Sequence, residues 1–219
     1  MASMRRRWLE VAVYLTSNRA LSSRCFDEIR RQYATPRRYY HTLHGHIRSC
    51  IEDLCRESGA SGFVRRNAIL ELALWFHDAV YDPRRTDNEE RSAQFARRIL
   101  RRLKAPEATI RDVERLILLT KHRVAPRDFL GGQLVDFDMA ILAASPSRYR
   151  RYRMGIRQEY SWVSENEYCE HRIRFLEMLL RRKYIFRTLF FRATRDRQAR
   201  ANIRREIKYL QRILAHSKE

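Results

Sequence analysis

Glycine and proline are scarce in this chain, with 6 and 5 residues among 219. Turns between strands depend on these two residue types, and no dipeptide typical of a two-residue hairpin is present. No segment alternates polar and apolar residues over the length of a strand, whereas apolar residues recur at helical spacing in most of the chain. The sequence therefore predicts an all-α fold.

Long apolar runs and paired cysteines are also missing. No run approaches the roughly 18 apolar residues that a transmembrane helix needs. Hydrophobic residues still make up 44% of the chain, which favours a folded domain with a real core. The cysteines show no paired metal-ligand spacing, so we expect free thiols in a reducing intracellular compartment, either the cytoplasm or an organelle such as the mitochondrion. They are Cys25, Cys50, Cys55 and Cys169.

Acidic residues are few, 26 against 46 lysines and arginines, which gives a formal net charge of +20. Only 5 of the basic residues are lysines, and arginine suits phosphate recognition, although a GC-rich genome would give the same excess. Residues 147–219 hold 20 basic and 8 acidic residues, whereas residues 71–90 hold 6 acidic residues and 2 arginines. An acidic stretch in a basic chain is expected of a cation site that attracts an anionic substrate.

The helical patterns divide the chain into three parts. Residues 1–29 could pass for an organellar targeting segment, but Glu10 and the helical spacing of the apolar residues favour a first structural helix. Residues 30–146 form a central core, in which we expect a turn over 58–62, a helix end at Asp82-Pro83 and a break at Gly131-Gly132. Residues 147–219 are predicted to be a basic helical part packed on that core. We expect helices there over 148–162 and 167–213, the second as one helix or two.

The most informative motif is His77-Asp78, at the end of a strongly apolar helical run. Burying an unpaired charge or hydrogen-bonding group costs several kcal/mol, so both side chains need partners. A divalent cation suits both, because imidazole nitrogen and carboxylate oxygen are ordinary ligands of such metals. The alternative is a buried histidine bonded to the backbone beside an exposed aspartate.

Further polar groups surround this pair in the sequence. Three histidines lie within six residues upstream, and acidic and basic groups follow downstream. They are His41, His44 and His46, then Asp87-Asn88-Glu89-Glu90, Lys121-His122-Arg123, and Asp136 with Asp138.

The order His, His-Asp, Asp in a helical chain resembles the HD-domain superfamily of metal-dependent phosphohydrolases. The likeness is closest to the family usually labelled predicted metal-dependent HD phosphohydrolases, and it covers about residues 30 to 210. It is carried by the segments 38–43, 72–82, 87–93, 135–142 and 156–163, of which the eleven residues from Leu72 are the most specific. The resemblance implies an HD-domain helical bundle with additional C-terminal helices, and a reaction type without a substrate.

The resemblance also implies roles for individual residues. His77 and Asp78 take the central ligand positions and Asp138 the last. His46 fits the first, because apolar residues follow it at the family's spacing, while His44 remains an alternative. The segment is similar to that of cyclic-nucleotide phosphodiesterases, which would make His41 the general acid. Here His41 and His46 are five residues apart instead of four, and Gly45 could absorb the extra residue.

These ligands would hold one divalent cation, or two, chosen from Mn, Mg, Fe, Co, Ni and Zn. Asp82, Glu89 or Glu90 could orient a water or hold the second cation, with helix capping as the alternative. Lys121, His122 and Arg123 could hold a substrate phosphate, although basic groups also suit a helix C-terminus.

Two functions follow from the sequence. The first is a metal-dependent phosphohydrolase acting on a phosphate mono- or diester, such as a nucleotide. The second is a catalytically degenerate protein of this fold that binds RNA in a ribonucleoprotein assembly, because basic residues interleaved with aromatic ones suit phosphates and bases. Its candidate RNA contacts are Arg148, Arg150, Arg151, Arg153 and Arg157.

Overall fold

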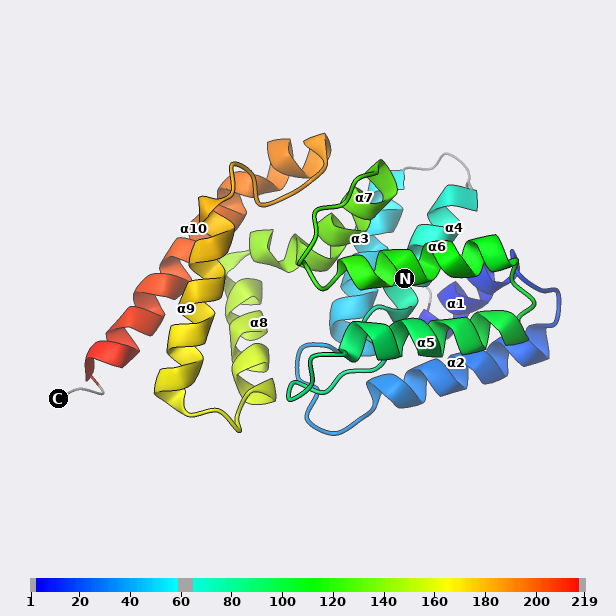
Figure 1. The fold of residues 1–219 in the computed structure, drawn as a ribbon, viewed down its shortest axis with the longest axis horizontal. Helices are drawn as coiled ribbons and strands as arrows, with labels where there is room; N and C mark the ends of the chain where they lie inside the picture. Colours follow the sequence, from blue (N-terminus) through cyan, green and yellow to red (C-terminus); the bar gives the residue numbers. More distant parts are fainter. Residues whose placement is uncertain (1–2, 59–64, 217–219) are drawn as a thin grey trace. The chain divides into compact units, whose positions relative to one another are not determined.

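The computed structural model describes residues 3–58 and 65–216, and these residues form helices and no strand (Figure 1). The predicted all-α fold is confirmed. The chain divides into two compact units, Met1–Asp138 and Met139–Glu219, so the division falls earlier than the predicted boundary after residue 146. Most of the turn predicted over 58–62 lies outside the described residues.

The first unit is built around α4 (Arg65–Phe76), which contacts α1, α3, α5 and α6. After its polar first residues the helix is apolar except for Glu71, and its residues 70–76 have no solvent exposure, as expected of a helix at the centre of a core. His77 and Asp78 follow this helix directly and are therefore carried into the middle of the unit. The other elements are α1 (Met4–Ala12), α2 (Arg19–Tyr33), η1 (Leu43–Ile47), α3 (Arg48–Ser58), α5 (Asn88–Arg102), α6 (Glu107–Leu119) and α7 (Phe129–Met139).

The helix expected to continue to Asp82 ends at Phe76 instead. The amide of Ala79 donates to the carbonyl oxygen of Phe76 at 2.9 Å, which closes a tight turn. The guanidinium of Arg38 donates to the carbonyl oxygens of Asp78 and Ala79 at 2.7 and 2.8 Å. A side chain from a distant segment thus satisfies the carbonyl groups that a longer helix would have used.

The break predicted at Gly131-Gly132 is wrong, since both residues lie inside α7. The Asp128 carboxylate accepts the Gly131 amide at 2.8 Å, as an N-terminal cap does. A β-carbon at position 131 would lie 2.7 Å from Cδ1 of Leu119. Gly131 therefore allows the start of α7 to approach the end of α6 closely.

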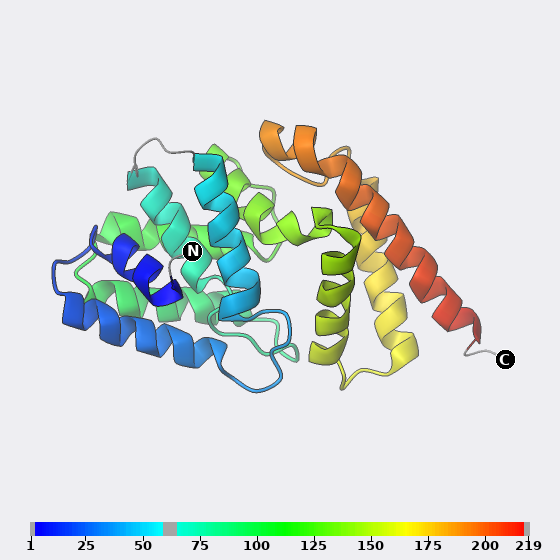
Figure 2. The same cartoon turned by 180° about the vertical axis from the view of Figure 1, so that it is seen from behind.

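The second unit contains the short η2 (Ala140–Ala143) followed by α8 (Pro146–Glu159), α9 (Glu165–Arg181) and α10 (Leu189–His216), which Figure 2 shows from behind. The region 167–213, for which the sequence left one helix or two open, holds two, α9 and α10. Buried polar groups link these helices: the Tyr149 hydroxyl donates to Glu206 at 2.5 Å, and Arg172 donates to Glu206 at 2.9 Å. Among the described residues, no helix has both the length and the apolar character to cross a membrane.

Candidate metal centre

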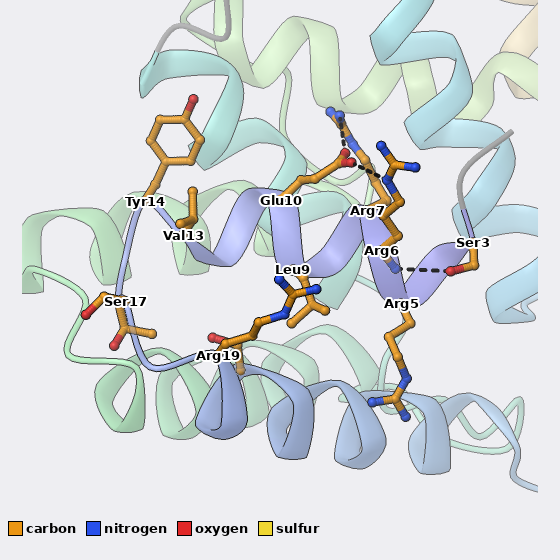
Figure 3. A pocket seen from close by; sticks show the side chains of 12 residues that line it. Ser3, Arg5, Arg6, Arg7, Leu9, Glu10, Val13, Tyr14, Ser17 and Arg19 are labelled. Carbon is orange, nitrogen blue, oxygen red and sulfur yellow. Dashed lines mark hydrogen bonds and ion pairs between the residues drawn. The ribbon is translucent and has the colours of Figure 1, made fainter.

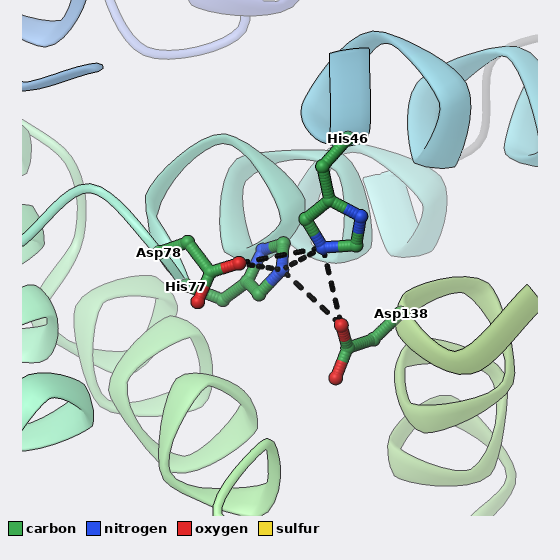
Figure 4. Close-up of side chains that lie close together, drawn as sticks. All are labelled: His46, His77, Asp78 and Asp138. Atoms are coloured by element: carbon green, nitrogen blue, oxygen red, sulfur yellow. Dashed lines mark hydrogen bonds and ion pairs between the residues drawn. The ribbon is translucent and has the colours of Figure 1, made fainter. Parts of the chain in front are cut away.

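Four side chains from three separate segments of the first unit converge on one point (Figure 4). His46 comes from η1, His77 and Asp78 follow α4, and Asp138 lies near the end of α7. One donor atom of each lies within 4.8 Å of the others. These are the four residues that the family resemblance implied, and such a cluster could hold a metal ion.

The contacts within the cluster are close and involve both imidazoles. The two Nε2 atoms of His46 and His77 lie 3.0 Å apart. His46 Nε2 is 3.3 Å from Asp78 Oδ2 and 3.2 Å from Asp138 Oδ1. The side chains of His46 and His77 are 2% and 0% exposed, whereas those of Asp78 and Asp138 are 17% and 15% exposed. Solvent therefore reaches the cluster at the carboxylates.

Neighbouring groups orient both imidazoles for coordination. His77 Nδ1 lies 3.1 Å from the carbonyl oxygen of Leu74, which can only accept, so this nitrogen carries the proton. His46 Nδ1 lies 2.9 Å from the Tyr40 hydroxyl, an arrangement that suits donation to the phenol oxygen. Both Nε2 atoms are then free to present lone pairs to the same point, as metal-binding histidines do.

Asp138 and the backbone next to it are also held in place. His122 Nε2 lies 2.9 Å from Asp138 Oδ2, which leaves Oδ1 directed at the cluster. The Cys50 thiol lies 3.4 Å from the carbonyl oxygen of Phe137 and 3.7 Å from His46 Nδ1. Cys50 thus connects the segments that carry the first and last predicted ligands.

The electrostatics of the cluster favour a bound positive charge. Burial works to lower the pKa of His77, but the charge of Asp78 and hydrogen bonds to Asp138 and Asp78 outweigh it and raise the pKa to about 10. Burial works to raise the pKa of Asp78, but the charges of His77 and His41 hold it well below its ordinary value. Two carboxylates that stay ionised in a buried site need a positive charge beside them. A proton on an imidazole or a bound metal ion can supply that charge.

A π-turn at η1 decides which upstream histidine joins the cluster. The Ile47 amide donates to the carbonyl oxygen of Thr42 at 3.3 Å, and the Gly45 amide donates to Thr42 Oγ1 at 3.0 Å. This wider turn directs His46 inward, and π-turns are frequent at functional sites. His46 is buried in the cluster and His44 is exposed.

Two of the predicted catalytic residues border the cluster. The His41 ring lies 5.7 Å from the His46 ring and 4.3 Å from the Tyr81 ring, between centroids. Glu89 is half-buried and its pKa is raised, first by burial and partly by the charge of Asp78. The third, Asp82, accepts the Arg84 amide at 3.0 Å and so stabilises its own turn.

The three residues predicted to hold a phosphate are placed differently from one another. Lys121 forms an ion pair with Glu90, His122 bonds Asp138, and Arg123 is exposed. Residue 122 also has a positive φ of 55°, which is uncommon for a residue other than glycine and turns the chain sharply after α6.

Sequence reasoning missed the residues that support the ligands, namely Arg38, Tyr40 and Cys50. The signal for the first two was the run Arg38-Tyr39-Tyr40-His41, which carries polar groups immediately before the histidines. Cys50 appeared only as part of an apolar stripe, and nothing in that pattern shows that its thiol touches a ligand.

The arginines proposed for RNA lie on α8 or at its end. Arg148, Arg150 and Arg151 are exposed, but the aromatic residues between them, Tyr149 and Tyr152, are buried. Arg153 lies over the Tyr209 ring at 4.1 Å, and Arg157 donates to the carbonyl oxygens of Tyr160 and Val163 at 2.8 and 3.2 Å. The interleaved pattern therefore does not produce one exposed basic and aromatic face.

A groove along α1 is also lined by arginines (Figure 3). Arg5 forms an ion pair with Asp27, Arg6 with Glu10 and Arg7 with Glu71. These guanidinium groups already have acidic partners, so the groove is a weaker candidate for an anion site than the cluster is for a cation.

No known protein family, curated protein or solved structure matches this chain.

Proposed function

We propose that this protein is a metal-dependent phosphohydrolase of the HD type that acts on a phosphate mono- or diester, such as a nucleotide. The observation that carries the proposal is the convergence of His46, His77, Asp78 and Asp138 on one point. The order of these ligands in the sequence, which resembles that of HD phosphohydrolases, supports the same reaction class.

The donor set fits a divalent cation. Two imidazole nitrogens and two carboxylate oxygens are acceptable to several first-row metals and leave positions of an octahedral ion open. A cation bound there would polarise a phosphoryl group and make a water molecule more acidic. The partly exposed carboxylates lie where a substrate would approach, and the buried imidazoles lie behind them.

His41 is placed to act on the leaving group. Its ring packs between Tyr40 and Tyr81, with centroid distances of 4.9 and 4.3 Å, and its charge is one cause of the low pKa of Asp78. In our proposal the His41 imidazolium donates its proton to the leaving oxygen, as a general acid does. Glu89, beside Asp78, accepts the proton of the attacking water, and Lys121 and Arg123 attract the phosphate.

The experiment compares two histidines of the same π-turn. The chelator-treated protein, His46→Ala and His44→Ala are titrated with Mn²⁺ by calorimetry, and turnover of p-nitrophenyl phosphate, bis-p-nitrophenyl phosphate and nucleotides is measured. We expect the unmodified protein and His44→Ala to bind Mn²⁺ and hydrolyse at least one ester. We expect His46→Ala to lose at least a hundredfold in affinity while remaining folded.

Failure of the unmodified protein to bind any divalent metal would contradict the proposal, as would equal affinity in the two variants. Metal binding without hydrolysis of any ester, combined with salt-dependent RNA binding, would support the degenerate RNA-binding alternative instead.

A further inference from the structure

Residues 181–192, which run from the last residue of α9 to the first turn of α10, combine charge of one sign with exposed apolar side chains. It contains five basic residues and no acidic one. Leu189 is 80% exposed, Phe190 49% and Tyr184 41%. Leu189 and Phe190 are neighbours in the sequence and both are exposed, and adjacent exposed apolar side chains are the kind of surface that marks interaction sites.

The exposure is a built feature of the fold, because buried residues of the same segment anchor it to the second unit. Ile185, Phe186 and Phe191 are at most 1% exposed. They lie on both sides of Leu189 and Phe190 in the sequence, so anchoring them also fixes the backbone that carries the exposed pair.

Side chains of α10 hold the backbone of the 181–192 segment. Arg200 donates to the carbonyl oxygens of Arg182 and Lys183 at 2.6 and 2.8 Å. Asp196 accepts the Ile185 amide at 2.6 Å. A surface held in this way loses little conformational entropy when it binds a partner.

Basic residues flank the exposed apolar pair in the sequence. Arg187 precedes Leu189 by two residues, and Arg192 follows Phe190 by two. Arg182 lies near Arg187: partial burial lowers the pKa of Arg182, and the charge of Arg187 lowers it further. Positive potential is therefore concentrated next to Leu189 and Phe190, which favours a partner that is both apolar and anionic.

The side chains favour a lipid surface over a nucleic acid. Unpaired bases stack on free aromatic faces, but the Tyr184 ring has Arg192 over it at 4.9 Å and Lys183 at 5.7 Å. Leu189, the most exposed of the three, has no aromatic face. A bilayer interface takes up aliphatic and aromatic groups alike, while its acidic headgroups attract lysine and arginine.

We propose that residues 181–192 dock the protein on an anionic lipid bilayer. Leu189 and Phe190 enter the boundary between headgroups and acyl chains, and the surrounding arginines and Lys183 contact acidic headgroups. The proposal is independent of the metal cluster, because every residue involved lies in the second unit.

Co-sedimentation of the full chain with vesicles tests the proposal. Vesicles of phosphatidylcholine are compared with vesicles that also contain phosphatidylserine, at low and high salt. We expect binding to the phosphatidylserine vesicles only, weakening as salt is raised. Leu189→Gln combined with Phe190→Gln is expected to weaken it about tenfold or more.

Matched variants separate this surface from general effects of charge and hydrophobicity. The variant with Met154→Gln and Val124→Gln loses two apolar side chains that lie outside residues 181–192 and are 57% and 65% exposed. We expect it to bind the vesicles as the unmodified chain does. Arg182→Ala with Arg187→Ala should weaken binding more than Arg148→Ala with Arg150→Ala, although the charge change is the same. Circular dichroism checks that each variant is folded.

Equal binding to both kinds of vesicle would overturn the proposal, and so would unchanged binding of the Leu189 and Phe190 variant. Failure to bind vesicles, together with RNA binding that the same substitutions abolish, would assign the surface to nucleic acid.

Discussion

At the residue scale, the cluster depends on neighbours that bind no cation themselves. Three groups hold the ligand atoms that do not face the centre of the cluster. Tyr40 contacts His46 Nδ1, the Leu74 carbonyl oxygen contacts His77 Nδ1, and His122 contacts Asp138 Oδ2. Such contacts fix the imidazole tautomers and the carboxylate orientation before a cation arrives. The carboxylate of Asp78 contacts His46 and His77 within the cluster, while the backbone carbonyl of Asp78 accepts from Arg38.

Tyr40→Phe tests this support. The substitution removes the hydroxyl that lies 2.9 Å from His46 Nδ1 and keeps the ring, so we expect the affinity for Mn²⁺ to fall about tenfold with little change in folding. Tyr39→Phe is the control, because Tyr39 is 54% exposed. Calorimetric titration measures both, and equal affinities would show that the hydroxyl does not orient His46.

At the element scale, the π-turn and the end of α4 both depart from regular helix at the site. Each departure directs a ligand: η1 turns His46 inward, and the turn after Phe76 places His77 and Asp78 side by side. Helical periodicity in the sequence predicts neither, because it records which residues face a core and not where a turn widens.

Gly45→Ala tests the π-turn. A β-carbon at position 45 would lie 2.7 Å from Thr42 Oγ1, the group that accepts the Gly45 amide. We expect the cap to be disturbed, with a loss of about 1 kcal/mol in the free energy of unfolding and about tenfold weaker Mn²⁺ binding. Thr42→Ser keeps the hydroxyl that accepts the Gly45 amide, so we expect it to retain the stability and the Mn²⁺ affinity of the unmodified protein. Unchanged metal affinity in Gly45→Ala would mean that His46 does not depend on this turn.

The ion pair between Arg7 and Glu71 ties α1 to α4. Arg7 donates to the fully buried Glu71 carboxylate at 2.8 and 2.5 Å. Arg7→Ala would leave that charge buried with little compensation, so we expect a loss of about 3 to 5 kcal/mol in the free energy of unfolding. The side chain of Arg6 is 74% exposed, so Arg6→Ala should lower the free energy of unfolding by less than about 1 kcal/mol. Urea denaturation measures both, and similar losses would contradict a structural role for α1.

At the scale of the whole molecule, the chain forms two units with different chemistry. The first holds the cluster within an apolar helical core, and the second carries most of the net positive charge. All four candidate ligands lie in the first unit, so the donor set is complete without a residue of the second.

The stability of the metal-free protein should depend on pH through the cluster. The pKa of His77 is raised from 6.5 to about 10, so the stability that its proton contributes is fully present below about pH 6.5 and is lost as pH rises through 10. The lowered pKa values of Asp78 and Asp138 contribute stability above their ordinary value of 3.8, and it is lost as pH falls further. We therefore expect the free energy of unfolding to be greatest between about pH 4 and 6.5.

A bound divalent cation should reverse this trend above pH 6.5. The cation displaces protons from the imidazoles, so its stabilising effect grows as pH rises. Thermal unfolding with and without Mn²⁺ between pH 6 and 9 measures the difference. A shift in unfolding temperature that does not change with pH would contradict binding at His46 and His77.

The sequence by itself determined the helical class, because few glycines and prolines and the recurring apolar spacing leave no other regular structure. It also placed His77 and Asp78 within a strongly apolar helical run, although it extended that helix to Asp82 and the structure ends it at Phe76. It left open whether His44 or His46 joins them and gave no role to Tyr40 or Cys50. Only the three-dimensional structure decided these points, because they depend on an irregular turn at residues 42–47 and on how that turn meets His77, Asp78 and Asp138 from distant segments. A local pattern fixes the face of a helix, but the partner of a buried polar group is fixed by packing.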